Sequence, residues 1–465
     1  MSACSIGAVM GDWWLAFETW LAGDAWVISA SLLLLHVVTS ALVSCHILLT
    51  RNNVRASVGW IGLVVLSPFV GTAIYWLFGI NRIVRRLVQP IDAPRDDREF
   101  FDLSEPITLL VNGDEAFPAM LDAIAQARES IALSTYIFDR DESGMRFVEA
   151  LAAARERGVD VRVLVDDVGI RYSRRPVDQD LIASGVSTAR FMPTRKLSLL
   201  GYLNLRSHRK LLVVDGATAF IGGMNIRHGN CLRANPASPV QDVHFRVCGP
   251  AVVPLERVFE EDWEFATGEA VRLPRHDTPV SGHQGRVRAI VDGPDDGVDR
   301  LQWVFLSALC SAQRRVRIVT PYFLPNEVLI NGFEVALMNG VVIEVIVPRR
   351  SNLFYMDWPM MAVFERLVPR GVRVYLADPP FDHSKIFLVD DEWCSIGSSN
   401  WDDRSLRLNF ELNLELVDRD LSRRLHALVD RKLAASRPLP VEELSGLTLP
   451  VRLRNRFLRL FSPYL

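Results

Sequence analysis

Lysine is scarce in this chain of 465 residues. Only four of its 52 basic residues are lysine, so arginine is the default cation and a lysine in a special position is informative. The basic residues are balanced by 55 acidic ones, which leaves a formal net charge of −3. A chain with this balance has no overall positive field for a polyanion, so binding of nucleic acid would require a local basic patch.

Cysteine is also sparse, and it is scattered. The six cysteines include no C-x-x-C pair, which argues against a zinc site and a disulfide scaffold and fits a reducing compartment. The composition excludes a largely disordered protein, because 49% of the residues are hydrophobic and 23% are charged. A chain of this length is expected to form roughly two to four structural units.

Charged residues are absent from two long stretches near the N-terminus, Trp26–Leu49 and Ser57–Ile80. Each stretch has 24 residues, which exceeds the ~20 that a helix needs to cross the hydrocarbon core. Tryptophans precede the first stretch, as in an aromatic belt, so residues 1–25 are predicted to be interfacial and residues 26–80 to be a membrane hairpin of two helices. Two buried core helices are the plainer alternative, and a re-entrant hairpin at Pro68 is left open.

Arginines are more frequent after the second stretch than between the two stretches. The connection holds Arg51 and Arg55. Because cytoplasmic segments carry an excess of Lys and Arg, the large body of the chain is predicted to be cytoplasmic. The arginines that follow the second stretch are Arg82, Arg85, Arg86, Arg95 and Arg98.

From Pro106 onward, β-type runs alternate with helical stretches, which indicates an α/β fold with substantial parallel pairing. The order of strand, helix, glycine and strand occurs twice. Tyr136 and Tyr322 match at an offset of 186 residues, and Gly185 and Gly371 match at the same offset. An internal repeat of this kind predicts two similar α/β lobes.

A matched motif follows the last strand of each lobe, at Ser207–Asn225 and at Asp382–Asn400. In both copies the histidine and the asparagine are 17 residues apart. Residues i and i+2 of a strand face the same side, so each histidine projects together with its lysine. The aspartate and its neighbour then turn the strand into a hairpin, and the returning strand can bring the asparagine beside the pair. The matched residues are His208, Lys210, Asp215 and Asn225 in the first copy and His383, Lys385, Asp390 and Asn400 in the second.

Paired histidines, lysines and asparagines suit the chemistry of a phosphoryl group. Lysine charges and amide donors can neutralise the phosphoryl oxygens without a metal. One imidazole can attack phosphorus while the other protonates the leaving oxygen. Each histidine also needs an acceptor for its other ring nitrogen. Asp242 and Glu411, which follow the two hairpins, are the candidates.

The paired H-x-K-x-x-x-x-D with a downstream G-x-x-N resembles the phospholipase D superfamily, and the wider chain resembles its bacterial cardiolipin synthase branch. That likeness extends to T-Y-I-F-D-R-D-E-S-G in the first lobe, to T-P-Y-F-L-P in the second and to the C-terminal F-S-P-Y-L. Two departures lie beside the second histidine, where Asp382 replaces a usual apolar residue and Ser384 replaces a common alanine. The fold that the resemblance implies is a two-lobed, duplicated α/β fold of the phospholipase D type, preceded by two transmembrane helices.

The resemblance also implies roles for the motif residues. His208 would be the nucleophile that forms a phosphatidyl-histidine, and His383 would act as general acid and then as base. No metal and no organic cofactor are expected. Asp215 and Asp390 complete the catalytic motif, but a structural role is expected for them because they sit at strand ends. The residues expected to hold the phosphodiester are Lys210, Asn225, Lys385 and Asn400.

The leading hypothesis is a membrane phosphatidyltransferase that makes cardiolipin and glycerol from two phosphatidylglycerol molecules. A phospholipase of the same fold, with water as the acceptor, is the first alternative. A nuclease is disfavoured by the net charge and the apolar stretches, and a non-catalytic scaffold by the two intact motifs. The expected partners are phosphatidylglycerol and other lipids of a bacterial inner membrane, in which the chain would be multi-pass. Nucleic acid is not expected, and the oligomeric state is left open.

The chain ends in a basic amphipathic segment, residues 449–465, in which apolar residues recur at helical spacing among arginines. Such a segment can lie on an anionic membrane surface, or its apolar residues can dock on the second lobe, and the sequence favours neither. The predicted organisation is residues 1–25 interfacial, 26–80 membrane hairpin, 81–105 linker, 106–268 first lobe, 269–297 linker, 298–448 second lobe and 449–465 tail.

Overall fold

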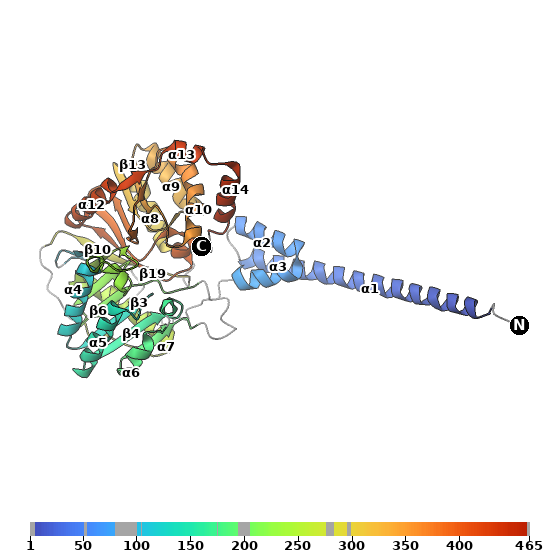
Figure 1. The fold of residues 1–465 in the computed structure, drawn as a ribbon, viewed down its shortest axis with the longest axis horizontal. Helices are drawn as coiled ribbons and strands as arrows, with labels where there is room; N and C mark the ends of the chain where they lie inside the picture. The colour runs from blue at the N-terminus through green and yellow to red at the C-terminus, as the bar shows by residue number, and fades with distance from the viewer. Residues whose placement is uncertain are drawn as a thin grey trace. The chain divides into compact units, whose positions relative to one another are not determined.

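The computed structural model contains two units, Met1–Arg82 and Ile83–Leu465, and each is described by itself (Figure 1). Arg51 and the five arginines from Arg82 to Arg98 lie outside the described part of the chain. The structure describes residues 5–50, 54–79, 100–103, 105–173, 175–193, 205–275, 283–294 and 299–462.

The first unit begins with one long helix, α1 (Ser5–Thr50). Its part from Trp26 to Thr50 is long and apolar enough to cross a membrane, judged by length and composition, and it is the one such helix among the described residues. The helix starts well before the predicted Trp26, so residues 5–25 continue the same helix. Their predicted interfacial position stays a prediction.

The second apolar stretch is not a single helix, which differs from the prediction. It consists of α2 (Val54–Leu66), α3 (Pro68–Ile74) and a π-helical turn, η1 (Tyr75–Gly79). The break falls at Ser67, whose φ of −146° and ψ of 81° are not helical, and Pro68 has no N–H to continue the ladder of α2. Neither α2 nor α3 alone reaches the ~20 residues of a full crossing. Two transmembrane helices are therefore not confirmed.

Side chains of α1 satisfy the carbonyl groups that the break leaves open. The carbonyl of Val64 has lost its usual partner because residue 68 is proline, and Ser40 Oγ donates to it at 3.2 Å. The neighbouring carbonyl of Val65 lies 2.9 Å from Nε2 of His36. An unsatisfied carbonyl is costly in an apolar environment, so these bonds explain why a polar pair occurs inside the apolar part of α1.

The second unit contains a seven-stranded sheet that forms the first lobe. The strands β3, β4 and β5 are parallel, and the other neighbours are antiparallel. In sheet order they are β2 (Thr108–Val111), β9 (Val243–Cys248), β7 (Thr218–Gly222), β6 (Leu211–Val214), β3 (Ser130–Thr135), β4 (Asp160–Asp166) and β5 (Ser187–Phe191). The helices of this lobe are α4 (Asn112–Gln126), α5 (Glu142–Glu156), α6 (Asp178–Ala183) and α7 (Val252–Thr267).

The second lobe repeats the same strand order and adds one strand at each edge, which confirms the duplicated α/β fold. The added strands are β1 (Phe101–Asp102) and β20 (Ser436–Pro438). Between them lie β10 (Arg286–Asp292), β19 (Glu411–Val417), β17 (Trp393–Gly397), β16 (Ile386–Val389), β11 (Arg315–Val319), β13 (Val342–Pro348) and β14 (Arg373–Ala377). The helices are α8 (Arg300–Ser311), α9 (Glu327–Met338), α10 (Asp357–Leu367), α11 (Asp403–Arg407), α12 (Arg419–Ala434), α13 (Val441–Ser445) and α14 (Leu449–Arg459). Two further pairs of short strands are β8 (Val240–Gln241) with β15 (Phe381–Asp382) and β12 (Phe323–Leu324) with β18 (Trp401–Asp402).

Both predicted linkers contain strands of the second lobe. The strand β10 lies inside residues 269–297, and β1 lies inside residues 81–105 and pairs with β10. Apart from β1, the second lobe therefore begins at Arg286 rather than at residue 298. The signal for this strand was present, because L-V-N-G at the end of β2 has its counterpart in I-V-D-G at the end of β10.

A shared core joins the two lobes. On the central strand β6, Leu211 and Val213 face this core, whereas the alternate residue Leu212 faces the helices of its own lobe. On the matching strand β16, Ile386 and Leu388 face the same shared core. Because successive side chains of a strand point to opposite faces, these buried runs are apolar on both sides. The starts of β6 and β16 are thereby fixed where the lobes meet.

Candidate active site

Each matched motif forms a hairpin, as predicted. His208 and Lys210 lie in the extended segment directly before β6, and the second copy has the same position before β16. Asp215 and Gly216 have φ of 48° and 59° in the turn of the first hairpin, and Asp390 has φ of 52° in the second. In the first hairpin, left-handed backbone at both central residues is the signature of the tight turn that matches strand twist. In the second, only Asp390 is left-handed, and aspartate tolerates this conformation better than most residues.

The carboxylates of the two turn aspartates bind backbone amides. Asp215 accepts hydrogen bonds of 2.8 to 2.9 Å from three consecutive N–H groups, residues 128–130, where β3 begins. Asp390 accepts bonds of 2.8 to 3.0 Å from residues 313–315, where β11 begins. Each carboxylate therefore fastens its hairpin to the neighbouring strand.

The two motif histidines face each other across the boundary between the lobes. The ring centroids of His208 and His383 are 6.4 Å apart, and the ring planes are inclined at 77°. Nδ1 of His208 lies 3.0 Å from the carbonyl oxygen of Ser398 and 3.1 Å from the carboxylate of Glu411. Nδ1 of His383 lies 2.8 Å from Oδ2 of Asp242. Because a carbonyl or carboxylate oxygen accepts, each Nδ1 carries the proton and each Nε2 is left with its lone pair.

Each histidine is held by the lobe that does not contain it. Extended backbone segments of the two lobes are hydrogen-bonded to each other at this boundary. This pairing explains why each histidine contacts a carboxylate of the opposite lobe. The N–H of His208 donates to the carbonyl of Phe410 at 2.9 Å, and the N–H of His383 donates to the carbonyl of Gln241 at 2.8 Å. The residues after Phe410 and Gln241 are Glu411 and Asp242, so each carboxylate arrives directly beside the opposite histidine.

The motif lysines and asparagines surround the same place. Lys210 and Lys385 are almost fully buried, and each donates from Nζ to the carbonyl of its own motif histidine. The side-chain oxygen of Asn225 accepts from the N–H of Ile137 at 3.1 Å. The corresponding oxygen of Asn400 is buried and has no hydrogen-bond partner among the described residues.

Burial dominates the electrostatics of the histidines. It lowers the pKa of His208 well below its ordinary value, and Lys210 and Lys385 add to this effect. Burial also lowers the pKa of His383 to about 4. Both imidazoles are therefore neutral at neutral pH in the substrate-free protein, which is the state a nucleophile requires.

The lysines and Glu411 are shifted in the directions that burial dictates. Burial lowers the pKa of Lys210 to about 7 and that of Lys385 to about 8. Burial raises the pKa of Glu411 to about 7, although Lys210 opposes that shift. Burial outweighs the nearby carboxylates of Glu411 and Asp242, which act to raise the pKa of both lysines. An incoming phosphodiester anion would add to their effect and favour the charged form of both lysines.

Two positions near the histidines were not predicted as site residues. The ring of Tyr136 contacts His208 edge-on, with centroids 5.4 Å apart, and Nζ of Lys210 lies 5.4 Å from the same ring centre. The sequence signal that could have identified Tyr136 as a site residue was its match with Tyr322 in the internal repeat. Ser398, whose carbonyl accepts from His208, also donates from Oγ to Glu411 at 2.5 Å, and it lies between the glycine and asparagine of the motif.

The unusual Asp382 next to His383 is paired with a lysine. Its buried carboxylate accepts from Nζ of Lys432 on α12 and from Oγ of Ser384 at 2.6 Å. Burial alone would raise the pKa of Asp382, but Lys432 and Ser384 hold it below its ordinary value. Nζ of Lys432 also lies 3.5 Å from the side-chain oxygen of Gln241 in the first lobe. Lys432 thus links α12 to both strands of the β8–β15 pair that precede Asp242 and His383.

Within the described residues, no group of three or more histidine, cysteine, aspartate and glutamate side chains is placed to hold a metal ion.

The duplicated sheets and the crossed histidine–carboxylate pairs define an enzyme of the phospholipase D superfamily. The phosphatidylserine synthase of Haemophilus influenzae has a similar fold, with a TM-score of 0.61 and 16% identity over 79% of this chain and 97% of that one. The family model described as "Cardiolipin synthase, PLD-like domain" matches residues 120–263 and 305–433. The chain belongs to the cardiolipin synthase family of this superfamily.

Relatives with established names support the same assignment. Cardiolipin synthase A of Pseudomonas putida is 36% identical over 77% of this chain and 75% of its own length. The major cardiolipin synthase ClsA of Bacillus subtilis is 28% identical over 94% of this chain and its whole length. A second family model, described as "Phospholipase_D-nuclease N-terminal", matches residues 38–79, which include the end of α1 and the broken second stretch.

Proposed function

We propose that this enzyme transfers a phosphatidyl group from one phosphatidylglycerol to the hydroxyl of a second, giving cardiolipin and glycerol. The proposal rests on the two imidazoles that face each other with their ring centroids 6.4 Å apart. Nδ1 of each ring is hydrogen-bonded to a carboxylate of the opposite lobe. A tetrahedral phosphorus between them has a nucleophile on one side and a proton donor on the other. The membership of the chain in the cardiolipin synthase family supports the choice of lipid.

In the first step, Nε2 of His208 attacks phosphorus and the bond between phosphorus and the glycerol oxygen breaks. His383 gives its Nε2 proton to the departing glycerol, so that neutral glycerol leaves and a phosphatidyl-histidine remains. His383 must be protonated for this step, although its pKa is about 4 in the empty site. The anionic phosphodiester raises that pKa when it binds, because a nearby negative charge favours the imidazolium.

In the second step, neutral His383 removes the proton from the hydroxyl of the second phosphatidylglycerol. That oxygen attacks phosphorus, the bond between phosphorus and Nε2 of His208 breaks, and cardiolipin leaves. His208 returns to its neutral form, and His383 is again protonated as after substrate binding. Asp242 and Glu411 keep both rings in the tautomer that these steps require.

The phosphodiester is held by the two lysines and the two asparagines. Lys210 and Lys385 turn from the carbonyl groups they now contact toward the phosphoryl oxygens, and the amide groups of Asn225 and Asn400 donate to the same oxygens. Buried cations are expensive in an empty site and strongly attractive to an anion. Charge stabilisation of the transition state is therefore supplied by side chains of both lobes.

We place the enzyme in the bacterial inner membrane, with the catalytic body on the cytoplasmic side. The helix from Trp26 to Thr50 supports the membrane association. Whether the stretch from α2 to η1 crosses fully or re-enters at Pro68 determines the number of passes. Both lipid substrates reside in the same membrane, which favours lipid over water as the acceptor.

The test is product analysis with the purified full-length protein in phosphatidylglycerol vesicles. Thin-layer chromatography and mass spectrometry should detect cardiolipin and stoichiometric glycerol. Phosphatidic acid as the main product would assign a hydrolase instead. Absence of both products would overturn the catalytic proposal.

A further inference from the structure

The C-terminal helix α14 docks on the second lobe through its arginines. Arg452 and Arg456 reach Glu365 of α10 at 3.4 and 3.0 Å, and the side chain of Glu365 is almost fully buried. The guanidinium of Arg454 lies 4.6 Å from the ring centre of Trp358, also on α10. The polar side of α14 thus faces the protein.

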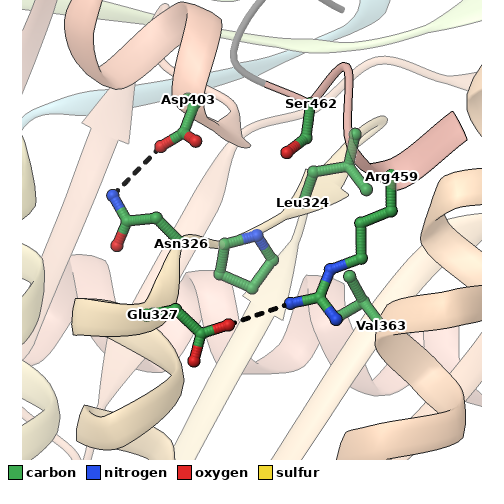
Figure 2. A pocket seen from close by; sticks show the side chains of 8 residues that line it. Leu324, Asn326, Glu327, Val363, Asp403, Arg459 and Ser462 are labelled. Atoms are coloured by element: carbon green, nitrogen blue, oxygen red, sulfur yellow. Dashed lines mark hydrogen bonds and ion pairs between the residues drawn. The ribbon is translucent and has the colours of Figure 1, made fainter. Parts of the chain in front are cut away.

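Beyond α10, the end of α14 is linked through the start of α9 to α11, the helix that follows the motif asparagine Asn400. Arg459 pairs with Glu327 at the start of α9 at 3.2 Å, and Asn326 donates to Asp403 of α11 at 3.1 Å. Figure 2 shows these two contacts on the wall of a cavity of about 140 Å³. Asp403 is three residues beyond Asn400, so α14 is connected by short links to the catalytic motif.

The apolar side of α14 faces away from the protein. Its large side chains are between 45% and 73% exposed. They recur at helical spacing, and the rings of Phe457 and Phe461 contact each other with centroids 5.4 Å apart. The exposed residues, here called the α14 stripe, are Leu449, Leu453 and Phe457 on the helix and Leu460 and Phe461 in the turn directly after it.

This orientation corrects one of the two interpretations of the tail. Leu453, Phe457, Leu460 and Phe461 do not dock on the second lobe, whereas the arginines do, and Tyr464 lies outside the described residues. A surface helix of a soluble protein normally buries its apolar stripe and exposes its charges. The reverse arrangement leaves a contiguous apolar surface exposed, which marks an interaction site.

We propose that the α14 stripe lies in the interfacial region of the anionic phospholipid bilayer in which the chain is anchored. The same chain carries the helix Trp26–Thr50, so a bilayer is present at high effective concentration whenever that helix is inserted. Arg454 and Arg456 contact Trp358 and Glu365 of α10 but are still exposed beside the stripe, so part of their surface is available to an anionic headgroup. Five side chains are also far fewer than the ~20–30 residues a side of a stable protein dimer, so a second copy is the weaker occupant.

The consequence is a fixed depth for the catalytic body. An amphipathic helix sits with its apolar side ~5–10 Å into the boundary between headgroups and acyl chains. The links from α14 to α9 and α11 would then hold the second lobe at the level of the lipid headgroups. This inference concerns where the body meets the lipid, and it goes beyond the proposed reaction.

The test uses the full chain reconstituted into phosphatidylglycerol vesicles that contain a phospholipid with a photoactivatable diazirine in its acyl chain. After illumination, mass spectrometry of the peptides should find lipid adducts on residues 449–462. The triple variant Leu453→Gln, Phe457→Gln, Leu460→Gln should lose adducts there by about tenfold or more, because the burial of each large apolar side chain is worth more than one factor of ten. The matched control is Val335→Gln, Met338→Gln, which alters exposed apolar residues at the far end of α9.

An activity measurement separates this surface from the active site. The triple variant should make less cardiolipin in vesicles but retain its activity toward short-chain phosphatidylglycerol dissolved in detergent, with an unchanged Tm. Labelling of residues 449–462 no higher than that of the α9 control peptide would overturn the proposal. Loss of a dimer in the triple variant, without lipid adducts in the parent, would overturn it in favour of a second copy. Labelled protein that makes no cardiolipin would refute the proposed function and leave the surface standing.

Discussion

Asp242 in the first lobe holds the imidazole of His383 in the second, with 2.8 Å between Oδ2 and Nδ1. Glu411 in the second lobe holds His208 in the first, at 3.1 Å. The orientation of each ring is thus set by the way the lobes meet. A shift between the lobes would misalign both rings at once.

Asp242→Asn should leave the fold intact and reduce kcat by about 10²-fold or more, by analogy with other carboxylates that orient a catalytic histidine. The amide can still offer an oxygen to Nδ1, but it does not stabilise the imidazolium. The measurement is kcat toward phosphatidylglycerol in mixed micelles. Asp292→Asn is the matched control, because burial already raises the pKa of Asp292 to about 7; equal losses in the two variants would contradict the role of Asp242.

The two histidines should differ in covalent chemistry. His208→Ala should form no phosphatidyl-enzyme, because the attacking Nε2 is gone. His383→Ala should form the adduct slowly and keep it, since no base activates the acceptor. Protein incubated with labelled phosphatidylglycerol, quenched in denaturant at alkaline pH and kept out of acid, would report the adduct by intact-mass spectrometry, because the bond between phosphorus and nitrogen hydrolyses in acid. An adduct on His208→Ala but not on His383→Ala would reverse the roles.

The activity should decline on the alkaline side through the lysines. Burial lowers the pKa of Lys210 to about 7 and that of Lys385 to about 8, so raising the pH above these values removes both charges in the free enzyme. The phosphodiester remains an anion, and it loses the cations that attract it. We therefore expect KM to rise above a pH of about 8 while kcat changes less, because the bound anion stabilises the charged lysines. A constant KM up to a pH of about 10 would contradict this assignment.

Lys385→Arg should lose most of its activity in a folded protein. Arginine keeps the positive charge, but its planar fork needs more room and a different angle than a buried ammonium. The residual activity should also lack the part of the alkaline rise in KM that Lys385 causes, because arginine stays protonated. Activity within a few-fold of the parent would show that the site requires only a positive charge.

Lys432→Met should destabilise the protein by about 3–5 kcal/mol, the usual cost of leaving a buried partner charge alone. The unpaired carboxylate of Asp382 would also raise the pKa of the adjacent His383, which must be protonated to give its proton to glycerol. The limb of kcat/KM on which His383 loses this proton should therefore move to higher pH. The double variant Lys432→Met, Asp382→Leu should restore both the stability and the pH profile of kcat/KM. Arg317→Met, which breaks a comparably buried pair with Glu344, serves as the control: it should lower stability without moving the pH profile.

Asp390→Ala should lower the free energy of unfolding by about 1–3 kcal/mol, because three backbone N–H groups lose their acceptor. The substitution should change kcat by only a few-fold well below Tm, since the carboxylate contacts amides at the start of β11. Asp390→Asn should be milder, because asparagine also tolerates the left-handed backbone. Urea unfolding and kcat measured on the same samples would check this, and a loss of kcat without a loss of stability would make Asp390 part of the chemistry.

The sequence was most informative where structure is local. The hairpin of each motif follows from the spacing of its histidine, lysine and asparagine, from its turn aspartate and from strand alternation. All of these features lie within one short segment of the chain. The pairing of Asp242 with His383 could not be derived, because the two residues are 141 positions apart and meet only through the contact of the lobes. The candidates could be named from the sequence, but not their partners.

The misplaced boundaries have a different cause. The Gly, Pro and Asp content of residues 269–297 hid the seven-residue strand β10, which pairs along its whole length with β19. In the second apolar stretch, the continuous hydrophobicity led to the prediction of one helix. Pro68 indicates a break, because proline lacks the backbone N–H that would continue the hydrogen bonds of the helix. For α14, helical spacing predicted two faces but not which one docks, because Glu365 and Glu327 belong to distant elements.

The exchange of carboxylates makes each lobe incomplete alone: it has a histidine whose orienting acid belongs to the other. A single lobe that associated with its own copy about a twofold axis would satisfy both histidines at once, since in such a dimer residue i meets j and j meets i. Joining the two copies in one chain removes the requirement that they be identical. Here one acid is aspartate and the other is glutamate. Among the described residues, only His383 has a lysine nearby that pairs with the residue before it, Lys432 with Asp382. The two equivalent positions of the site thus carry different groups, although the strand order around them is the same.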